Sequence, residues 1–294
     1  MSTYDLITDS IISILEAGEI PPWQREWNAN SCIPRNAVTG TSYSGINVIN
    51  LQLHGMHHGY KTNEWATMRQ WATLGASVKG QKGTLGVFFK KVQGVDDSGE
   101  EYGFNVAKKF YLFNADQADG YEASQEAADA MKERTIENIG QAHELPNSMG
   151  VLLTPGEPSY HPVLDRIAMP AATKFTTDEA YFSTMAHEAC HATGHKTRLD
   201  RKLSTRFGDN AYAMEELIAE LGAVYICASM NIPYRLENHV SYLNSWLKVM
   251  RSDRKAIFTA AAAAQRASDF IGAAISSHRL INEQESELGA LLYG

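Results

Sequence analysis

The sequence predicts an α+β protein of two domains: a small α+β domain over residues 1–120 and a mainly helical domain with a small sheet over residues 121–294. Three observations lead to this prediction. With 294 residues, the chain is long enough to bury two hydrophobic cores. Strand-like apolar runs are concentrated before residue 120, whereas helical periodicity dominates after it. The two parts also differ in charge and in tryptophan content.

The first domain is expected to begin with a helix and to continue into a small sheet. Apolar residues at helical spacing over residues 4–18 predict a helix that ends at Gly18 and the prolines that follow it. Further helices are expected over residues 46–54 and 64–74. Apolar runs predict strands over residues 76–78, 84–91 and 104–113, with turns at 80–83 and 96–99.

The second domain is expected to be mainly helical. A helix over residues 123–142 is assigned to it, followed by two short strands between residues 149 and 170, the second around 165–169. That strand would offer a sheet edge along which an extended peptide could lie. The clearest helix covers residues 176–194, because Thr176 and Glu179 form a capping-box pattern and Gly194 favours a helix end. Two more helices are expected over residues 212–230 and 238–277.

The composition excludes several classes of protein. Three widely separated cysteines, Cys32, Cys190 and Cys227, argue against a disulfide scaffold and favour a reducing compartment. The N-terminal segment lacks the basic stretch of a signal peptide, and no apolar run reaches the ~20 residues that cross a bilayer. We therefore expect a soluble, cytoplasmic protein without a membrane partner.

Charge is distributed unevenly along the chain. The net charge is −8 overall, but residues 20–93 contain eight lysines and arginines and two glutamates, a local charge of +6, together with four of the five tryptophans. Single-stranded nucleic acid binds to aromatic faces on which bases stack and to cations along the phosphates. The segment therefore predicts binding of single-stranded DNA, although the aromatic residues could instead belong to the core. The candidate DNA-binding residues are Trp23, Trp27, Arg35, Tyr43, Trp65, Arg69, Lys79, Lys82, Lys90 and Lys91.

The sequence His187-Glu188-Ala189-Cys190-His191 points most clearly to chemistry. On a helix, residues four apart lie on one face, so both imidazoles can reach one cation at ~2.0–2.1 Å. Glu188 lies beside them, where it could deprotonate a metal-bound water as the catalytic carboxylate. The alternative is a helix face with two unrelated histidines.

A third metal ligand is expected from a helix further along the chain. Glu216 and Glu220 are four residues apart, so one carboxylate can complete a two-histidine, one-glutamate site while the other orients a ligand histidine. The stretch resembles the Glu-x-x-Ala-Asp motif of gluzincin metallopeptidases, which favours Glu216 as ligand and Glu220 as its support. The reverse assignment, with Glu220 as ligand and Glu216 as support, stays open, and Glu215 is a weaker candidate ligand. The alternative to a metal site is that these glutamates lie on an exposed helix face. Zinc suits these donors, and Mn²⁺ or another divalent metal is also compatible.

A set of short motifs is distributed over both halves of the chain: Pro22-Trp23, Trp27, residues 34–36, 39–40 and 43–47, Trp65, Thr67, Gln70, and residues 74–76, 78–83, 165–170, 187–195, 198–201 and 215–220. These motifs resemble those of ArdC-type antirestriction proteins. The resemblance implies an N-terminal domain that binds single-stranded DNA, a zincin-like metallopeptidase domain, and protection of incoming mobile-element DNA against host restriction endonucleases. It also implies His187, His191 and Glu216 as metal ligands and Glu188 as the catalytic carboxylate.

The function predicted from the sequence is therefore antirestriction by a protein that binds single-stranded DNA and carries a metal centre of metallopeptidase type. A host restriction endonuclease or another protein would be the substrate of that centre. Two alternatives stay open. One is a DNA-associated metalloprotease in repair or replication, and the other is a DNA-binding module in which the metal is structural and not catalytic.

Overall fold

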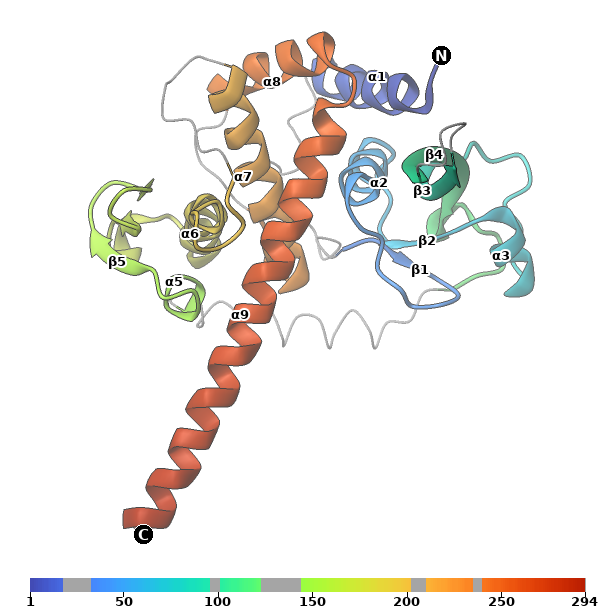
Figure 1. Cartoon of the computed structure of the whole chain (residues 1–294). Helices are drawn as coiled ribbons and strands as arrows, with labels where there is room; N and C mark the ends of the chain where they lie inside the picture. The colour runs from blue at the N-terminus through green and yellow to red at the C-terminus, as the bar shows by residue number, and fades with distance from the viewer. Residues whose placement is uncertain (18–32, 96–100, 123–143, 202–209, 235–239, 294) are drawn as a thin grey trace. The chain divides into compact units, whose positions relative to one another are not determined.

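The computed structural model describes residues 1–17, 33–95, 101–122, 144–201, 210–234 and 240–293 (Figure 1). The chain divides into two compact units. Unit 1 contains Met1–Pro22, Ile33–Gln125 and Met250–Phe258, and unit 2 contains Trp23–Cys32, Glu126–Val249 and Thr259–Gly294. The predicted α+β class with two domains is confirmed. Within the described residues, no helix combines the length and apolar composition of a membrane span.

Unit 1 begins with α1 (Thr3–Glu16), which starts at a capping box between Ser2 and Asp5. Its buried face packs against the segment Met250–Phe258 from much later in the chain. Thr8 Oγ1 donates a hydrogen bond to the Arg254 carbonyl at 2.8 Å, and the rings of Tyr4 and Phe258 meet edge to face with centroids 4.7 Å apart. Unit 1 is therefore completed by residues that lie outside the predicted domain of residues 1–120, and that domain boundary stays a prediction.

The sheet of unit 1 has the strand order β1-β2-β4-β3. Short strands β1 (Arg35–Asn36) and β2 (Glu64–Ala66) lie on one side, and β3 (Thr84–Val95) and β4 (Glu101–Asn114) form a long antiparallel hairpin. Helix α2 (Ile46–His57) runs along the outer edge of β3. There, Asn47 Nδ2 donates to the Val87 carbonyl and Asn50 Nδ2 donates to the Leu85 carbonyl, both at 2.7 Å. These amides bind backbone groups of an edge strand that would otherwise face solvent.

The prediction of a helix over residues 64–74 is wrong at its start. Glu64–Ala66 form β2, and α3 covers only Met68–Thr73. Thr67 is the N-cap of α3 and forms a capping box with Gln70, so the chain changes from strand to helix at a local signal. The predicted strand over residues 76–78 is reduced to one isolated bridge between Ser77 and Asp119.

Unit 2 contains α5 (Glu144–Ser148) and a small sheet of β5 (Leu152–Pro155), β6 (Ser159–His161) and β7 (Arg166–Met169). The strand order is β5-β7-β6. The predicted strand around residues 165–169 therefore exists, but it lies in the centre of the sheet and offers no free edge. The helix predicted over residues 123–142 lies outside the described residues.

The helix that carries the histidines lies between the small sheet of unit 2 and another helix. Helix α6 (Asp178–Thr193) contacts β6 and β7 on one side and α7 (Asn210–Ser229) on the other (Figure 1). Its N-cap is Thr177, one residue after the predicted Thr176, and Thr177 Oγ1 accepts from the Ala180 amide.

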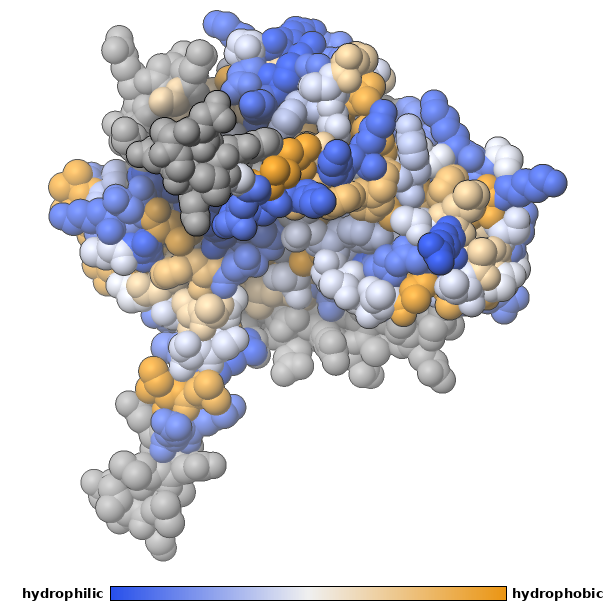
Figure 2. Space-filling model, turned by 45° about the vertical axis from the view of Figure 1, so that its right-hand side comes forward, coloured by the Kyte–Doolittle hydropathy of each residue, from blue (hydrophilic) through white to orange (hydrophobic). Residues whose placement is uncertain are grey.

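The helix predicted over residues 238–277 is two helices, α8 (Val240–Ser252) and α9 (Ala256–Tyr293). A turn at Asp253 separates them, in which the Asp253 side chain accepts from the Lys255 amide at 2.8 Å. Aspartate favours such caps over helix interiors because its side chain competes for backbone amides. Leu280 and Ile281 are exposed on the far part of α9, where Figure 2 shows apolar surface.

Candidate metal centre

Helix α6 presents His187 and His191 one turn apart on the same face. Their ring centroids are 4.8 Å apart and their planes are nearly perpendicular. His187 is buried and His191 is partly exposed. Glu188, the predicted catalytic carboxylate, is buried beside them in the same helix.

Helix α7 lies close against α6 because Gly222 leaves room for Cys190. A Cβ atom at Gly222 would overlap the Cys190 sulfur. Burial raises the pKa of the Cys190 thiol to about 12, so this side chain behaves as a small apolar group and not as a thiolate. The close packing brings the glutamates of α7 next to the histidines of α6.

Glu216 lies between the two imidazoles. Its Oε2 is 3.6 Å from His187 Nε2, and its Oε1 is 3.6 Å from His191 Nε2. One donor atom from each of the three residues lies within 4.8 Å of the others. A tetrahedral ion with bonds of ~2.0–2.1 Å holds its donors about 3.4 Å apart, so two imidazoles and this carboxylate fit a divalent metal such as zinc.

The remaining ring nitrogens face two other carboxylates of α7. His187 Nδ1 is 3.5 Å from Glu220 Oε2, and His191 Nδ1 is 3.2 Å from Glu215 Oε1. A carboxylate on the far nitrogen of a ligand histidine fixes the tautomer and the ring orientation. Glu220 therefore lies where the sequence places a supporting residue. Glu215, which the sequence indicates only as a weaker candidate ligand, lies in the same position relative to His191.

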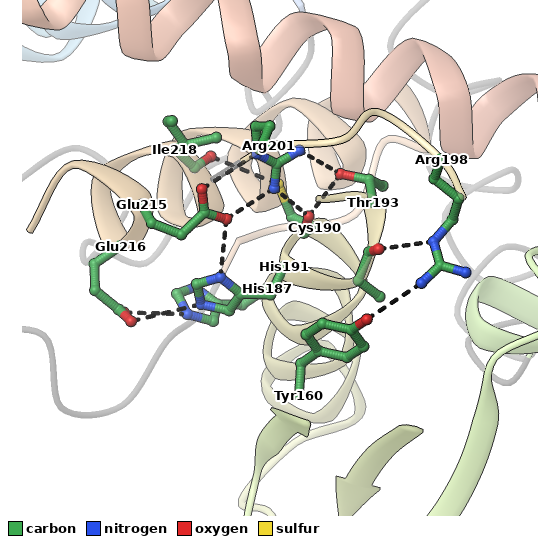
Figure 3. A network of polar contacts seen from close by, with 11 residues as sticks. Tyr160, His187, Cys190, His191, Thr193, Arg198, Arg201, Glu215, Glu216 and Ile218 are labelled. Atoms are coloured by element: carbon green, nitrogen blue, oxygen red, sulfur yellow. Dashed lines mark hydrogen bonds and ion pairs between the residues drawn. The ribbon is translucent and has the colours of Figure 1, made fainter. Parts of the chain in front are cut away.

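Arg201 holds Glu215 in place, a role that the sequence did not indicate. Its Nη2 and Nε donate to the two oxygens of Glu215 at 2.8 and 3.2 Å. The same guanidinium donates to Thr193 Oγ1 at 2.7 Å and to the Cys190 carbonyl at 2.8 Å (Figure 3). Arg201 thus connects the C-terminal end of α6 to the carboxylate that orients His191.

Glu216 and Glu215 stay ionised despite their burial. Burial by itself would raise the pKa of Glu216, but the hydrogen bond with His187 and the charge of His191 lower that pKa to about 2. Burial likewise opposes ionisation of Glu215, and its contacts with His191 and Arg201 lower its pKa. An ionised carboxylate is the form that binds a metal or orients a histidine.

A second polar cluster fixes the end of α6 to the sheet. Arg198 Nε donates to the Ala192 carbonyl at 2.7 Å, and its Nη2 donates to the Tyr160 hydroxyl at 3.3 Å (Figure 3). Its two terminal nitrogens also bind the carboxylate of Asp165 just before β7. Tyr160 in β6 also donates to Asp165, at 2.8 Å. The hydrogen bond from Arg198 lowers the pKa of Asp165. These contacts position the sheet relative to the histidine helix.

Only some of the candidate DNA-binding residues are on the surface. Trp65 has an exposed fraction of 1% and packs in a core cluster with Leu51 and Leu112, so its prediction as a stacking platform is wrong. Arg35 is paired with Glu64 at 2.7 Å, and Tyr43 is half-buried. Trp23 and Trp27 lie outside the described residues. The exposed candidates are Arg69, Lys79, Lys82, Lys90 and Lys91.

Replacing Arg201 with alanine is expected to weaken metal binding by about 10- to 100-fold, the usual effect of losing an outer hydrogen-bond partner. The substitution leaves Glu215 buried without its guanidinium, so the orientation of His191 is less well fixed. Calorimetric titration of metal into the full chain measures this change. Arg266→Ala, at an exposed position of α9, is the control. Equal affinities for the two variants would contradict the role given to Arg201.

Both halves of the chain are similar to known protein families. Residues 1–136 match the family model of the N-terminal domain of anti-restriction factor ArdC, and residues 141–263 match that of a zincin-like metallopeptidase. Protein y4eC of Sinorhizobium fredii is 36% identical over 285 residues, covering 92% of this chain and 91% of that protein. DNA primase TraC of Escherichia coli is 32% identical over 292 residues, which are 91% of this chain and 20% of TraC.

Two crystal structures of the antirestriction ArdC protein from plasmid R388 are similar over the whole fold. The metal-free structure has a TM-score of 0.76 at 35% identity and covers 94% of this chain and 99% of that one. The Mn(II)-bound structure has a TM-score of 0.71 at 34% identity, with coverage of 94% and 98%. With three side chains in the zincin-like part placed where they could hold a metal, and with this similarity along its length, the chain belongs to the ArdC family of antirestriction proteins.

Proposed function

We propose that this protein protects incoming mobile-element DNA from host restriction endonucleases in the cytoplasm. In this proposal unit 1 binds single-stranded DNA, and unit 2 is a metal-dependent peptidase that acts on a restriction endonuclease or another protein. Membership of the ArdC family and the match of its N-terminal family model support the DNA-binding part. Unit 1 would then recognise DNA, and unit 2 would cleave a protein.

The peptidase part rests on one observation: one donor atom each of His187, His191 and Glu216 lies within 4.8 Å of the other two. In this proposal, the three residues hold a divalent metal, which activates water and polarises a carbonyl. Glu188 takes the proton of that water and returns it to the leaving amine. Glu220 and Glu215 keep the two imidazoles in the required tautomer and orientation.

Zinc is the proposed native metal, because two imidazoles and one carboxylate are the ligands of many catalytic zinc sites. The related ArdC protein has been crystallised with Mn(II), and a site of nitrogen and oxygen donors accepts several divalent ions.

Two other functions have specific support. Similarity to part of DNA primase TraC favours a DNA-associated metalloprotease in repair or replication. A metal held by His187, His191 and Glu216 could equally serve only to stabilise unit 2, because the Arg201–Glu215 contacts that orient His191 suit a structural site as well as a catalytic one. DNA binding would then account for protection.

Replacing His191 with alanine is expected to remove the bound metal, because one of three ligands is lost. Metal analysis of full-length protein purified without added cations measures the loss and also identifies the native ion. His195→Ala is a matched control, since His195 lies four residues further along, beyond the end of α6, and its Nδ1 contacts Thr197 Oγ1 at 2.8 Å. If the His191 variant retains as much metal as the control, the proposed site is wrong.

A further inference from the structure

One face of the β3–β4 hairpin carries two aromatic rings and two lysines. In the antiparallel register, Phe88 pairs with Lys108, Gly86 with Phe110 and Lys90 with Val106. Paired residues point to the same side of a sheet, and side chains alternate along each strand. Phe88, Lys90, Lys108 and Phe110 therefore share one side, which we call the hairpin face.

On the hairpin face, one aromatic ring is partly buried and supports a second ring that is exposed, an arrangement that suits the stacking of a ligand. Phe110 is half-buried and packs on the core cluster that contains Trp65. It also lies over Gly86, where an added Cβ would come within 2.9 Å of the ring. Phe88 is 50% exposed, with its ring centroid 6.0 Å from that of Phe110. The exposed ring is thus supported by a neighbour that is anchored in the core.

The neighbouring ring of Phe89 is exposed to a similar extent, 47%, but it has different partners. Phe89 points to the opposite side, where its ring lies 6.5 Å from Tyr4 and 6.4 Å from Phe258. Phe89 therefore has aromatic partners from α1 and the start of α9, within unit 1. On the hairpin face, the outer ring surface of Phe88 faces solvent.

The two strands are strongly basic. They contain four lysines and one acid, Glu101, and Lys90, Lys91, Lys108 and Lys109 are all exposed. Lysines on an edge strand often serve to prevent pairing with another sheet, and β3 is such an edge. β4 pairs with β2 only at Phe113 and Asn114, so Lys108 lies beside an open edge as well. The edge explanation can account for the lysines, but it does not account for the exposed Phe88 ring beside them.

We infer that the hairpin face is the surface on which single-stranded DNA binds, with a base stacked on Phe88 and phosphates contacted by Lys90 and Lys108. This inference rests on the DNA-binding part of the proposed function and identifies its site. A flat exposed ring between two cations matches the alternation of base and phosphate in a single strand. In a duplex the bases are already stacked and paired, so Phe88 would have no free base to contact.

The test uses the full-length protein and a fluorescent oligothymidine, with binding measured by anisotropy. Phe88→Ala is expected to weaken binding by roughly 5- to 100-fold, the range for loss of one stacking contact, and Phe88→Trp to preserve it. Tyr111→Ala is the matched control, because Tyr111 is 53% exposed and pairs with Leu85 on the other side of the same hairpin.

A second pair of variants tests the charge. Lys108→Gln is expected to lower the slope of log affinity against log salt by about 0.7, the value for one phosphate contact on a single strand. Lys109→Gln, at the adjacent exposed position that points to the other side, is expected to leave that slope unchanged. Circular dichroism checks that all variants are folded.

The outcomes separate the inference from the function on which it rests. If the unsubstituted protein binds the oligonucleotide but Phe88→Ala and Tyr111→Ala bind equally well, the hairpin face is not the site and DNA binding lies elsewhere. If the unsubstituted protein does not bind at all, the DNA-binding part of the proposed function is wrong. Binding of duplex as tight as that of single strands would overturn the stacking role of Phe88.

Discussion

Replacing Glu188 with glutamine is expected to lower metal-dependent peptide hydrolysis by about 10²- to 10⁴-fold, the contribution of a positioned general base. The amide has nearly the same shape as the carboxylate but cannot accept the proton of the attacking water. His187, His191 and Glu216 are unchanged, so the metal should stay bound. Cleavage of denatured casein, measured with and without single-stranded DNA, together with metal analysis of the same samples, checks both statements.

Glu179→Gln is a suitable control, because Glu179 lies in the first turn of α6, away from the histidines in the sequence. Transfer of a plasmid into a restricting host then gives a second measurement. If Glu188→Gln protects the plasmid as well as the control does while it retains metal, proteolysis is not needed for protection. The non-catalytic alternative would then be favoured over the peptidase proposal.

Replacing Trp65 with alanine is expected to cost about 3–5 kcal/mol of stability, as for other large buried side chains. The indole is almost completely buried, with Leu51 and Leu112 in the same cluster and the Tyr60 ring 5.8 Å away. The substitution therefore leaves a cavity in unit 1. Urea unfolding of the full chain, followed by circular dichroism, should show an earlier transition for this unit, whereas the other unit keeps its midpoint.

The control for this experiment is Met68→Ala, because Met68 is 65% exposed and lies only three residues further along. A different result would restore the interpretation made from the sequence. If Trp65→Ala unfolds like the unsubstituted protein but loses affinity for single-stranded DNA, Trp65 is a stacking residue on the surface after all.

The central part of the candidate metal site could be predicted because it depends on local spacing. His187 and His191 share a helix face by their separation alone, and Glu216 and Glu220 do so on a second helix. The contribution of Arg201 could not be found in this way. Its position depends on how α7 is rotated against α6 and on where the chain after α6 returns to that helix.

Tertiary contacts also explain the other differences between the structure and the predictions made from the sequence. The composition of a basic, loop-rich segment does not show whether an aromatic ring in it is buried or exposed. Composition alone therefore could not distinguish the buried Trp65 from the exposed Phe88. The central position of β7 could not be predicted either, because the pairing order of short strands is not contained in any one of them. Predictions made within single helices were more successful than those that needed two elements to be placed together.

The segment Met250–Phe258 completes unit 1 but is synthesised long after the rest of that unit, which affects folding during translation. At about 5–20 residues per second, the ribosome finishes the first 125 residues on the order of ten seconds before this segment emerges. During that time the nascent α1 lacks the contacts of Thr8 with Arg254 and of Tyr4 with Phe258. A premature stop between Glu126 and Met250 would thus leave the N-terminal fold unfinished, although that fold is encoded almost entirely upstream.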